Sequence, residues 1–310
     1  MNQPRVIIPG GTGFLGRHVS AYFAAQNYEV VVLTRSPKPD SLARQVAWDG
    51  ETLGTWANEF DGAAAVINLA GRTVNCRYTE KNKREIYDSR LRSTAVIGKA
   101  IAQCAVPPPV WINSSSATIY RYAEDRAMDE ATGEIGTGFS VDVCQQWEKA
   151  LNEAATPHTR KIALRAAMVF GHGEDGPYAM FHRLVRFGLG GTMGHGRQYI
   201  SWIHIADFTR ALAWLIAHDE LAGAINLSSP NPMPSREFMR AFREVCHQPI
   251  GLPATRWMLE LGAFFLRTET ELPLKSRRVV PSRLLESGFV LKFPSLREAL
   301  QNLIAPTAVV

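Results

Sequence analysis

A glycine-rich turn near the start of the chain constrains the fold more than any other feature of the sequence. It reads Gly10-Gly11-Thr12-Gly13-Phe14-Leu15-Gly16 and lies between an apolar run at residues 6–8 and an amphipathic helical pattern. Glycine tolerates positive φ in such a turn and lets a phosphate approach the backbone N–H groups at the start of the helix. A strand, a G-x-x-G-x-x-G turn and a helix together predict a dinucleotide site, with close packing as the alternative reason for the glycines.

Short apolar runs alternate with helical patterns through the first half of the chain. The runs lie at residues 6–8, 29–33, 46–48, 64–69, 110–113 and 161–170. Each run has the length and composition of a buried strand. Strands that alternate with helices favour an α/β fold in which a doubly wound parallel sheet carries helices on both faces.

The regular alternation ends after Phe170. Glycines are frequent over residues 171–200, which indicates a loop-rich insertion with a short helix near 181–187. The later predicted elements are a strand at 201–205, a helix from Asp207 to His218, a strand at 224–227, a helix capped by Ser235 and a last helix at 295–303. Prolines just after residue 229 mark a boundary. We therefore expect a large domain at residues 1–230 and a small α/β domain at 231–310 on the substrate side.

Charge and cysteine content argue against several other classes of protein. The 310 residues carry a formal net charge of +5 with acidic and basic side chains interspersed, so we expect no nucleic-acid partner. The four cysteines lie far apart without a C-x-x-C pair, which favours neither a disulfide scaffold nor a metal site. No apolar stretch approaches the roughly 18 residues of a membrane span, and the start lacks a signal-peptide pattern. We expect a cytoplasmic protein without a membrane partner.

The second predicted strand ends in Thr34-Arg35, about 20 residues after the glycines. An NAD-binding fold usually places an acidic residue there to bind the adenine ribose. Residues 34–36 contain no Asp or Glu, and an arginine suits the 2′-phosphate of NADP(H), which a carboxylate would repel. The alternative is an ordinary surface arginine.

Two further strand ends carry small or hydroxyl side chains. Asn68-Leu69-Ala70-Gly71 closes the fourth strand, where small residues let part of a dinucleotide pass the backbone. The fifth strand runs into the serines at 114–116 and then Tyr120. Because ligands of open α/β sheets bind at the carboxyl ends of the strands, Ser116 is a candidate for binding a substrate oxygen. A serine-rich loop that satisfies its own backbone is the alternative.

These motifs together resemble the extended short-chain dehydrogenase/reductase superfamily of sugar-nucleotide epimerases and dehydratases. More narrowly, the chain is similar to the epimerase-like family that includes the human short-chain dehydrogenase member 39U. The motifs of the narrower resemblance are Ser89-Arg90, Trp147-Glu148, Gly190-Gly191, Gly194-x-Gly196-x-Gln198, Ser201-Trp202-Ile203-His204-Ile205-x-Asp207, and a tail that contains Pro281-Ser282-Arg283-Leu284 and Phe293-Pro294. The match runs from residue 5 to about residue 304.

The resemblance implies a Rossmann domain that binds NADP(H) and a small C-terminal domain. It places phosphates at the glycine turn, the 2′-phosphate at Thr34-Arg35, and the nicotinamide end near Val169. The predicted cofactor-binding residues are Gly10, Gly11, Thr12, Gly13, Phe14, Leu15, Gly16, Thr34, Arg35, Leu69, Ala70, Gly71, Glu85, Arg90, Ser114 and Val169.

The chain departs from the superfamily at its catalytic pair. Superfamily members use a Tyr as general acid/base and a Lys four residues later to lower the pKa of that Tyr. Alignment of the helix after residue 139 by Glu148 puts Ser140 and Cys144 at these places, and no Tyr-x-x-x-Lys occurs in residues 120–160. The enzymatic reading therefore depends on analogy of fold.

Other side chains are candidates to replace the pair. We predict Ser116 and Tyr120 as catalytic residues, while Tyr122 and Cys144 are further candidates from the same region. The predicted substrate-binding residues are Arg165, Arg197 and His204, and His195 lies in the same glycine-rich insertion as Arg197. The alternatives are core packing for Cys144 and His204, and a solvated loop for Arg165, His195 and Arg197.

Two functions follow as hypotheses. The first is an NADP(H)-dependent oxidoreductase or epimerase-like enzyme that acts on an unidentified small molecule between the Rossmann core and the insertion. The second is a regulatory or scaffold protein that binds NADP(H) without turnover. The resemblance also favours a homodimer formed through the helices predicted at 79–104 and 139–155.

Overall fold

The computed structural model describes residues 3–39, 41, 43–173, 176–254 and 275–305. Its centre is a seven-stranded sheet in the order β10-β6-β5-β4-β1-β2-β3, and every neighbouring pair is parallel. The strands are β1 (Arg5–Pro9), β2 (Glu29–Thr34), β3 (Arg44–Ala47), β4 (Ala65–Asn68), β5 (Val110–Ser116), β6 (Arg160–Ala166) and β10 (Gly223–Leu227). This arrangement confirms the predicted doubly wound parallel sheet.

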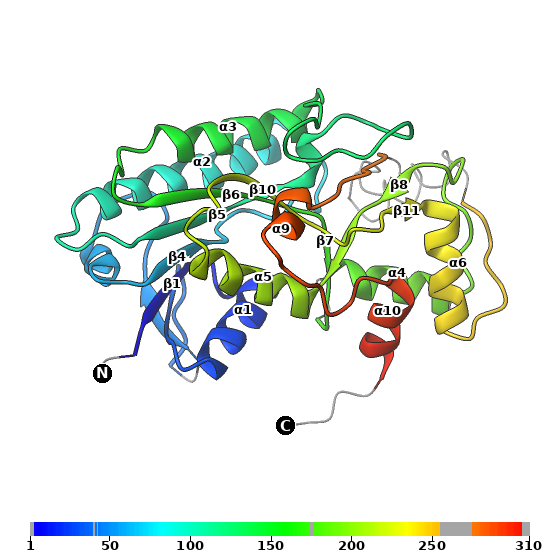
Figure 1. Cartoon of the computed structure of the whole chain (residues 1–310), viewed down its shortest axis with the longest axis horizontal. Helices are drawn as coiled ribbons and strands as arrows, with labels where there is room; N and C mark the ends of the chain where they lie inside the picture. Colours follow the sequence, from blue (N-terminus) through cyan, green and yellow to red (C-terminus); the bar gives the residue numbers. More distant parts are fainter. Residues whose placement is uncertain (1–2, 40, 42, 174–175, 255–274, 306–310) are drawn as a thin grey trace.

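Helices cover both faces of the sheet (Figure 1). On one face lie α1 (Phe14–Ala25) and α5 (Ile205–Ala217), and on the other α2 (Glu80–Ala102), α3 (Phe139–Glu153) and the short 3-10 helix η1 (Thr55–Phe60). Side chains of β1 alternate between the two cores, because Val6 and Ile8 join the core under α1 and α5 while Ile7 joins the core under α2 and α3. Burial on both faces explains the continuous apolar runs of these strands.

The chain reverses direction across the sheet between β1 and β4. From β1 it builds β2 and β3 on one side and then returns to place β4 on the other side. Open α/β sheets bind ligands in a crevice at the carboxyl ends of the strands on either side of such a reversal.

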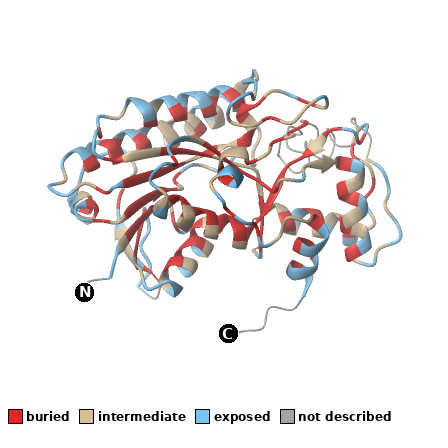
Figure 2. Cartoon of the chain, viewed as in Figure 1, coloured by how far each residue is buried: buried red, intermediate tan, exposed pale blue. Residues whose placement is uncertain are grey.

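A second lobe packs beside the carboxyl edge of the sheet (Figure 1). It contains α4 (Pro177–Arg186), α6 (Ser235–Val245) and α10 (Leu296–Ile304), with the short pairs β7 (Met168–Phe170) with β9 (Trp202–His204) and β8 (Tyr199–Ile200) with β11 (Met233–Pro234). Phe170 lies in its aromatic core, where it stacks on Trp202 and contacts Phe181, Phe238 and Phe242. The buried residues of this lobe form a cluster distinct from those of the large sheet, and Figure 2 shows buried positions in both parts of the molecule.

The C-terminal segment contributes to both lobes. Its helix α9 (Ser282–Glu286) packs against β10, and Leu284, Phe289 and Leu291 join the core under α5. The chain then crosses back to form α10 in the second lobe. The division into domains at residues 1–230 and 231–310 thus remains a prediction. Residues from both sides of this boundary belong to the same packed cores.

The structure corrects three local predictions. The run at 161–170 is two strands, because the chain leaves the main sheet after β6 and β7 pairs with β9 instead. Helix α5 begins at Ile205 with His204 as its N-cap, not at Asp207. Asp207 is fully buried in the first turn and accepts hydrogen bonds from the backbone N–H groups of Lys292 and Phe293. Helix α6 begins at Ser235, after Pro234 as its N-cap, and so Ser235 does not cap it.

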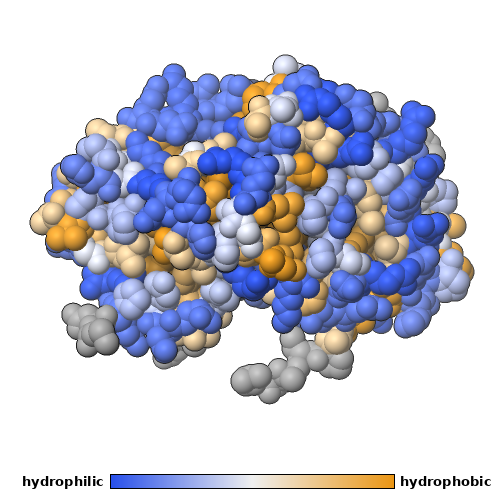
Figure 3. All heavy atoms as spheres, in the orientation of Figure 1, coloured by the Kyte–Doolittle hydropathy of each residue, from blue (hydrophilic) through white to orange (hydrophobic). Residues whose placement is uncertain are grey.

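Hydrophilic residues cover most of the face shown in Figure 3, and hydrophobic atoms reach this surface in smaller groups between them. None of the helices in the described part of the chain has both the length and the hydropathy that a bilayer crossing requires.

Candidate functional site

The glycine turn after β1 is shaped by close backbone contact with the end of β4. Gly10 has a φ of +76°, and a Cβ added to it would lie 2.7 Å from the backbone nitrogen of Ala70. A Cβ on Gly16 would lie 2.4 Å from backbone atoms of Gly11. Only glycine fits either place without a shift of the backbone. These glycines bring the turn, α1 and the β4 end together at the crevice.

Gly13 differs because it faces open space. The nearest atom to a Cβ built there is the carbonyl oxygen of Gly10, 3.9 Å away. Gly13 is the N-cap of α1 and provides no side-chain cap, and the first turn of the helix contains no acidic residue. The backbone N–H groups there and the positive end of the helix dipole suit a phosphate. The turn therefore fits the diphosphate of a dinucleotide.

Two buried asparagines hold the β4 end in place. Asn68 donates from Nδ2 to Oδ1 of Asn113 on β5 at 2.6 Å, and its Oδ1 accepts from the backbone N–H of Ala70 at 3.0 Å. Both asparagines are at most 1% exposed. The contact between these two asparagines fixes the turn at Leu69-Ala70-Gly71, and no sequence pattern predicts it.

The end of β2 presents an exposed cation. Thr34 is buried, and its Oγ1 accepts from the backbone N–H of Ser36 at 3.4 Å. Arg35 is exposed, and the structure records no hydrogen bond or ion pair between it and another described residue. Arg35 can therefore turn toward a ligand on this edge of the sheet without breaking an existing contact.

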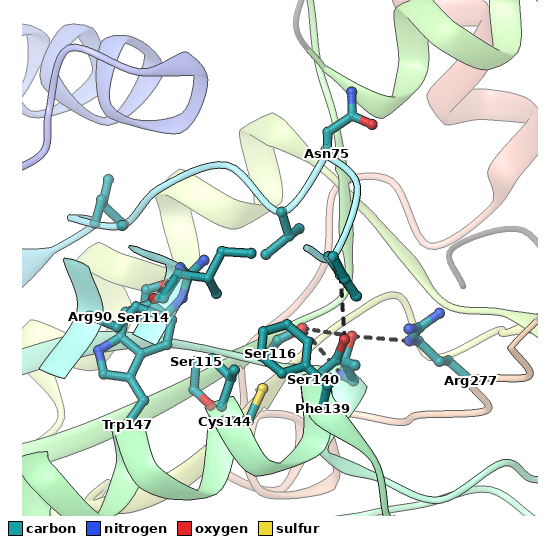
Figure 4. A pocket seen from close by; sticks show the side chains of 17 residues that line it. Asn75, Arg90, Ser114, Ser115, Ser116, Phe139, Ser140, Cys144, Trp147 and Arg277 are labelled. Carbon is teal, nitrogen blue, oxygen red and sulfur yellow. Dashed lines mark hydrogen bonds between the residues drawn. The ribbon is translucent and has the colours of Figure 1, made fainter. Parts of the chain in front are cut away.

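A pocket of about 210 Å³ opens beside the ends of β4 and β5 and the start of α3 (Figure 4). It is lined by Leu69, Gly71, Val74, Asn75, Tyr78, Ile86, Arg90, Ser114, Ser115, Ser116, Thr118, Phe139, Ser140, Val143, Cys144, Trp147 and Arg277. Six candidate residues are thereby brought together, namely Leu69, Gly71, Arg90, Ser114, Ser116 and Cys144. Its place at the carboxyl ends of the strands suits the nicotinamide half of a dinucleotide and a small substrate beside it.

Hydroxyl groups line one side of the pocket. The Ser116 hydroxyl donates to Thr118 Oγ1 at 3.0 Å, and Thr118 Oγ1 also accepts from Nε of Arg277 at 3.1 Å. Arg277 is nearly buried and comes from the C-terminal segment, so this segment completes the pocket wall. Neither Thr118 nor Arg277 was a sequence candidate, because only the fold brings residues 159 apart into contact.

Ser140 and Cys144 line the pocket from α3, where the superfamily has its Tyr and Lys (Figure 4). Burial raises the pKa of the Cys144 thiol to about 12, so it stays protonated and is a poor acid or base near neutrality. A phenol reaches the same place from another element. The hydroxyl of Tyr78, just before α2, lies 3.5 Å from Oγ of Ser140. Sequence reasoning missed Tyr78 because it belongs to no motif.

Arg90 enters the pocket from α2. Its guanidinium group lies 4.9 Å from the centre of the Trp147 ring and donates to the backbone carbonyls of Arg72 and Ile86, each at 3.1 Å. Glu85, one turn earlier, forms an ion pair with Arg72 and does not line the pocket. Of this predicted pair, only Arg90 faces the pocket.

Tyr120 and Arg165 form a buried network instead of facing the pocket. Tyr120 is 1% exposed, donates to Asn226 Oδ1 at 2.9 Å and accepts from Arg165 at 2.9 Å. Arg165 forms a two-point contact with Glu148, which also accepts from the Ser115 hydroxyl at 2.7 Å. Burial raises the pKa of Tyr120, against the effect of Arg165. The expectation that these two side chains reach the crevice is corrected.

The remaining candidates also lie outside the pocket. His204 is 3% exposed, and its Nδ1 accepts from the backbone N–H of Ala206 at the start of α5. Arg197 and His195 are exposed beside Glu124, with Nε of Arg197 3.6 Å from the carboxylate. The Tyr122 hydroxyl contacts the same carboxylate at 2.5 Å. Val169 is buried in β7.

The comparisons with known proteins agree with this geometry. The NAD dependent epimerase/dehydratase family matches residues 6–228, and a domain of unknown function (DUF1731) matches residues 254–303. The epimerase family protein ML0860 of Mycobacterium leprae is 33% identical over 95% of this chain and 94% of its own length.

Solved structures show the same fold. The crystal structure of the human epimerase family protein SDR39U1 with NADPH has a TM-score of 0.86 at 28% identity and covers 96% of this chain and 98% of that one. The nucleoside-diphosphate sugar epimerase from Corynebacterium glutamicum has a TM-score of 0.78 at 25% identity, over 97% of this chain and 58% of its own. Together with the glycine turn and the crevice, these matches show that the chain belongs to the NAD dependent epimerase/dehydratase family.

Proposed function

We propose that this protein binds NADP(H) in preference to NAD(H) and transfers hydride to or from a small molecule held in the pocket beside Ser116. The observation that carries the cofactor choice is the exposed Arg35 at the end of β2, with no acidic residue in positions 34–36. The human relative SDR39U1 was crystallised with NADPH, which supports the same choice. All four cysteines are free thiols, which fits the proposed cytoplasmic location.

The residues present fit each part of the cofactor. The open face at Gly13 would take the diphosphate, Arg35 the 2′-phosphate, and the pocket beside Ser114 and Arg90 the nicotinamide riboside. When bound, the cofactor supplies the hydride chemistry. The Ser116 hydroxyl would orient a substrate oxygen, and the apolar wall that includes Phe139 and Trp147 would exclude water.

Fluorescence titration tests the cofactor choice. The ring of Trp147 lines the pocket, so bound dinucleotide should change its emission. We expect NADPH to bind more tightly than NADH. Arg35→Ala should weaken NADPH by about 1.5–3 kcal/mol, the contribution of a hydrogen bond to a charged group, and leave NADH unchanged.

The control is Lys99→Ala, which removes one positive charge at the far end of α2. It should leave both affinities unchanged, because that charge lies outside the site. Equal affinity of the unmodified protein for NADPH and NADH would contradict the assignment of Arg35.

A second function is favoured by the residues at the catalytic positions of α3. With Ser140 and Cys144 there, the pocket has no phenol and no amine from this helix. A protein that binds NADP(H) as a regulatory signal would show tight binding and no NADPH oxidation with any carbonyl or nucleotide-sugar substrate.

A further inference from the structure

Tyr78 places a phenol in the pocket although α3 has none. Its ring packs edge-on against Phe139 with 4.8 Å between ring centres, and its hydroxyl lies 3.5 Å from Oγ of Ser140. Ser140 stands where the superfamily tyrosine is expected. The hydroxyl of Tyr78 therefore lies close to the position of the superfamily tyrosine, although Tyr78 belongs to the loop before α2.

Arg90 supplies a cation in the lining of the same pocket. Its position against Trp147 is fixed by two backbone carbonyls. Arg90 and Tyr78 line the same pocket. Burial lowers the pKa of Arg90, and the charges of Cys144 and Tyr78 oppose this effect. Cys144 stands where the superfamily lysine is expected. The pocket thus contains a phenol and a cation, as the superfamily site does, but here neither side chain comes from α3.

Few other groups in the pocket can exchange a proton. Among the lining residues that belong to the described part of the chain, none is Asp, Glu, His or Lys, and Tyr78 carries the only phenol. The Cys144 thiol is held protonated by burial, and serine and threonine hydroxyls are far weaker acids than a phenol. Tyr120 is excluded by its buried bonds to Asn226 and Arg165.

We propose that Tyr78 is the acid that protonates the substrate oxygen, and that Arg90 stabilises the phenolate that remains. The proposal rests on the proposed function, since it concerns the same pocket. Reduction of a carbonyl needs a hydride, which carries the electron pair, at the carbonyl carbon; NADPH would supply it when bound and would be oxidised to NADP⁺. The O–H bond of Tyr78 breaks as a new O–H bond forms on the carbonyl oxygen. The product is an alcohol, and water returns a proton to Tyr78. Oxidation of an alcohol runs the same steps in reverse.

Titration of the tyrosines by NMR tests the pairing without any substrate. The full-length protein, labelled with ¹³C at the Cζ atoms of tyrosine, is followed from neutral to alkaline pH with and without NADP⁺, and Tyr78→Phe and Tyr87→Phe assign the two signals. Tyr87 is the matched control, because it packs against the same Phe139 ring but bonds to Asp142 outside the pocket. Burial and Asp142 raise the pKa of Tyr87.

We expect Tyr78 to ionise at a lower pH than Tyr87. Arg90→Met should move the Tyr78 titration upward by about one pH unit, the lower end of the effect of a neighbouring charge, and Arg90→Lys should move it less. The Tyr87 titration should stay in place in both variants. A Tyr78 signal that titrates with Tyr87, or that does not respond to Arg90→Met, overturns the proposal.

Kinetics with a generic carbonyl give a second test. NADPH oxidation is measured at saturating cofactor with 4-nitrobenzaldehyde as the probe. Tyr78→Phe keeps the ring against Phe139 and should lower kcat by about 100-fold, the usual contribution of a general acid, with NADPH affinity unchanged. Tyr87→Phe should keep the rate. Full turnover by Tyr78→Phe overturns the proposed role of Tyr78 and leaves the proposed function intact. Failure of the unmodified protein to bind NADPH overturns the proposed function.

Discussion

The glycines of the turn after β1 differ in what a side chain would meet at each position. At Gly16 a methyl group would collide with the backbone of Gly11, whereas at Gly13 it would enter open space. No protein atom would exclude a side chain at Gly13, but a bound ligand still could. We infer that Gly16 is needed for folding and Gly13 for the approach of the cofactor.

Two alanine substitutions separate these roles. Gly16→Ala should destabilise the protein by about 1–3 kcal/mol, the usual cost of overpacking. Gly13→Ala should cost at most about 1 kcal/mol as an unfavourable N-cap, but should weaken NADPH binding strongly because its methyl group occupies the face of the diphosphate. Urea unfolding and fluorescence titration of both variants give the two quantities. Unchanged NADPH affinity in Gly13→Ala would show that the phosphates lie elsewhere.

At single residues, the place of a side chain could be predicted where a motif fixes the local backbone. Gly10, Leu69, Ser116 and Arg90 lie at the crevice because each follows or faces the end of a strand. Tyr120 could not be predicted, since its burial depends on Asn226, which is 106 residues away. Tyr78 could not be found either, because only the packing of α2 beside α3 brings it to Ser140.

The start of α5 shows how an element boundary depends on one side chain. His204 ends β9, and its Nδ1 caps α5 by accepting from the backbone N–H of Ala206. Its ring also packs against Phe293 with 4.1 Å between ring centres. Asp caps helices more often than His does, so the sequence predicts a start of α5 at Asp207, later than the observed start at Ile205. An imidazole that caps in this way must be neutral.

The stability of the protein should therefore fall in mild acid through His204. Burial lowers its pKa from 6.5 to about 4, with Asp207 acting against this effect and with His172 and Lys292 adding to it. The unfolded chain takes up a proton below pH 6.5 that the folded chain refuses, so stability is lost as the pH falls from 6.5 towards 4. The loss from this group should be at most about 3.5 kcal/mol, since each pKa unit corresponds to about 1.4 kcal/mol.

Unfolding curves of His204→Asn measure this contribution. Asparagine can cap α5 but does not titrate, so the variant should lose less stability than the unmodified protein over the same pH range. The difference between the two proteins at pH 7.5 gives the separate packing cost against Phe293. Parallel pH dependences would show that His204 is accessible to protons in the folded state.

At the scale of the whole molecule, the two lobes share one C-terminal segment. The parallel sheet with helices on both faces could be predicted, because it depends on local periodicity and on the alternation of strands with helices. The path of residues 276–294 could not, since this segment has little regular structure and is held by distant partners. Its Arg277 reaches Thr118, its Val279 lies beside Met128, and its Phe289 packs against Trp214 of α5.

Adjacent residues of this segment test whether the lobes unfold together. Phe289 is 3% exposed in the core under α5, whereas Val290 is 73% exposed. Phe289→Ala should lower the free energy of unfolding by about 3–5 kcal/mol, the usual cost of removing a buried ring. Val290→Ala should change it by less than about 0.5 kcal/mol. Because Phe289 belongs to the core of the large sheet, Phe289→Ala should shift a single transition seen alike by circular dichroism and by tryptophan fluorescence. If it shifts only a separate second transition, residues 231–310 form an independent domain and the shared core does not couple the lobes.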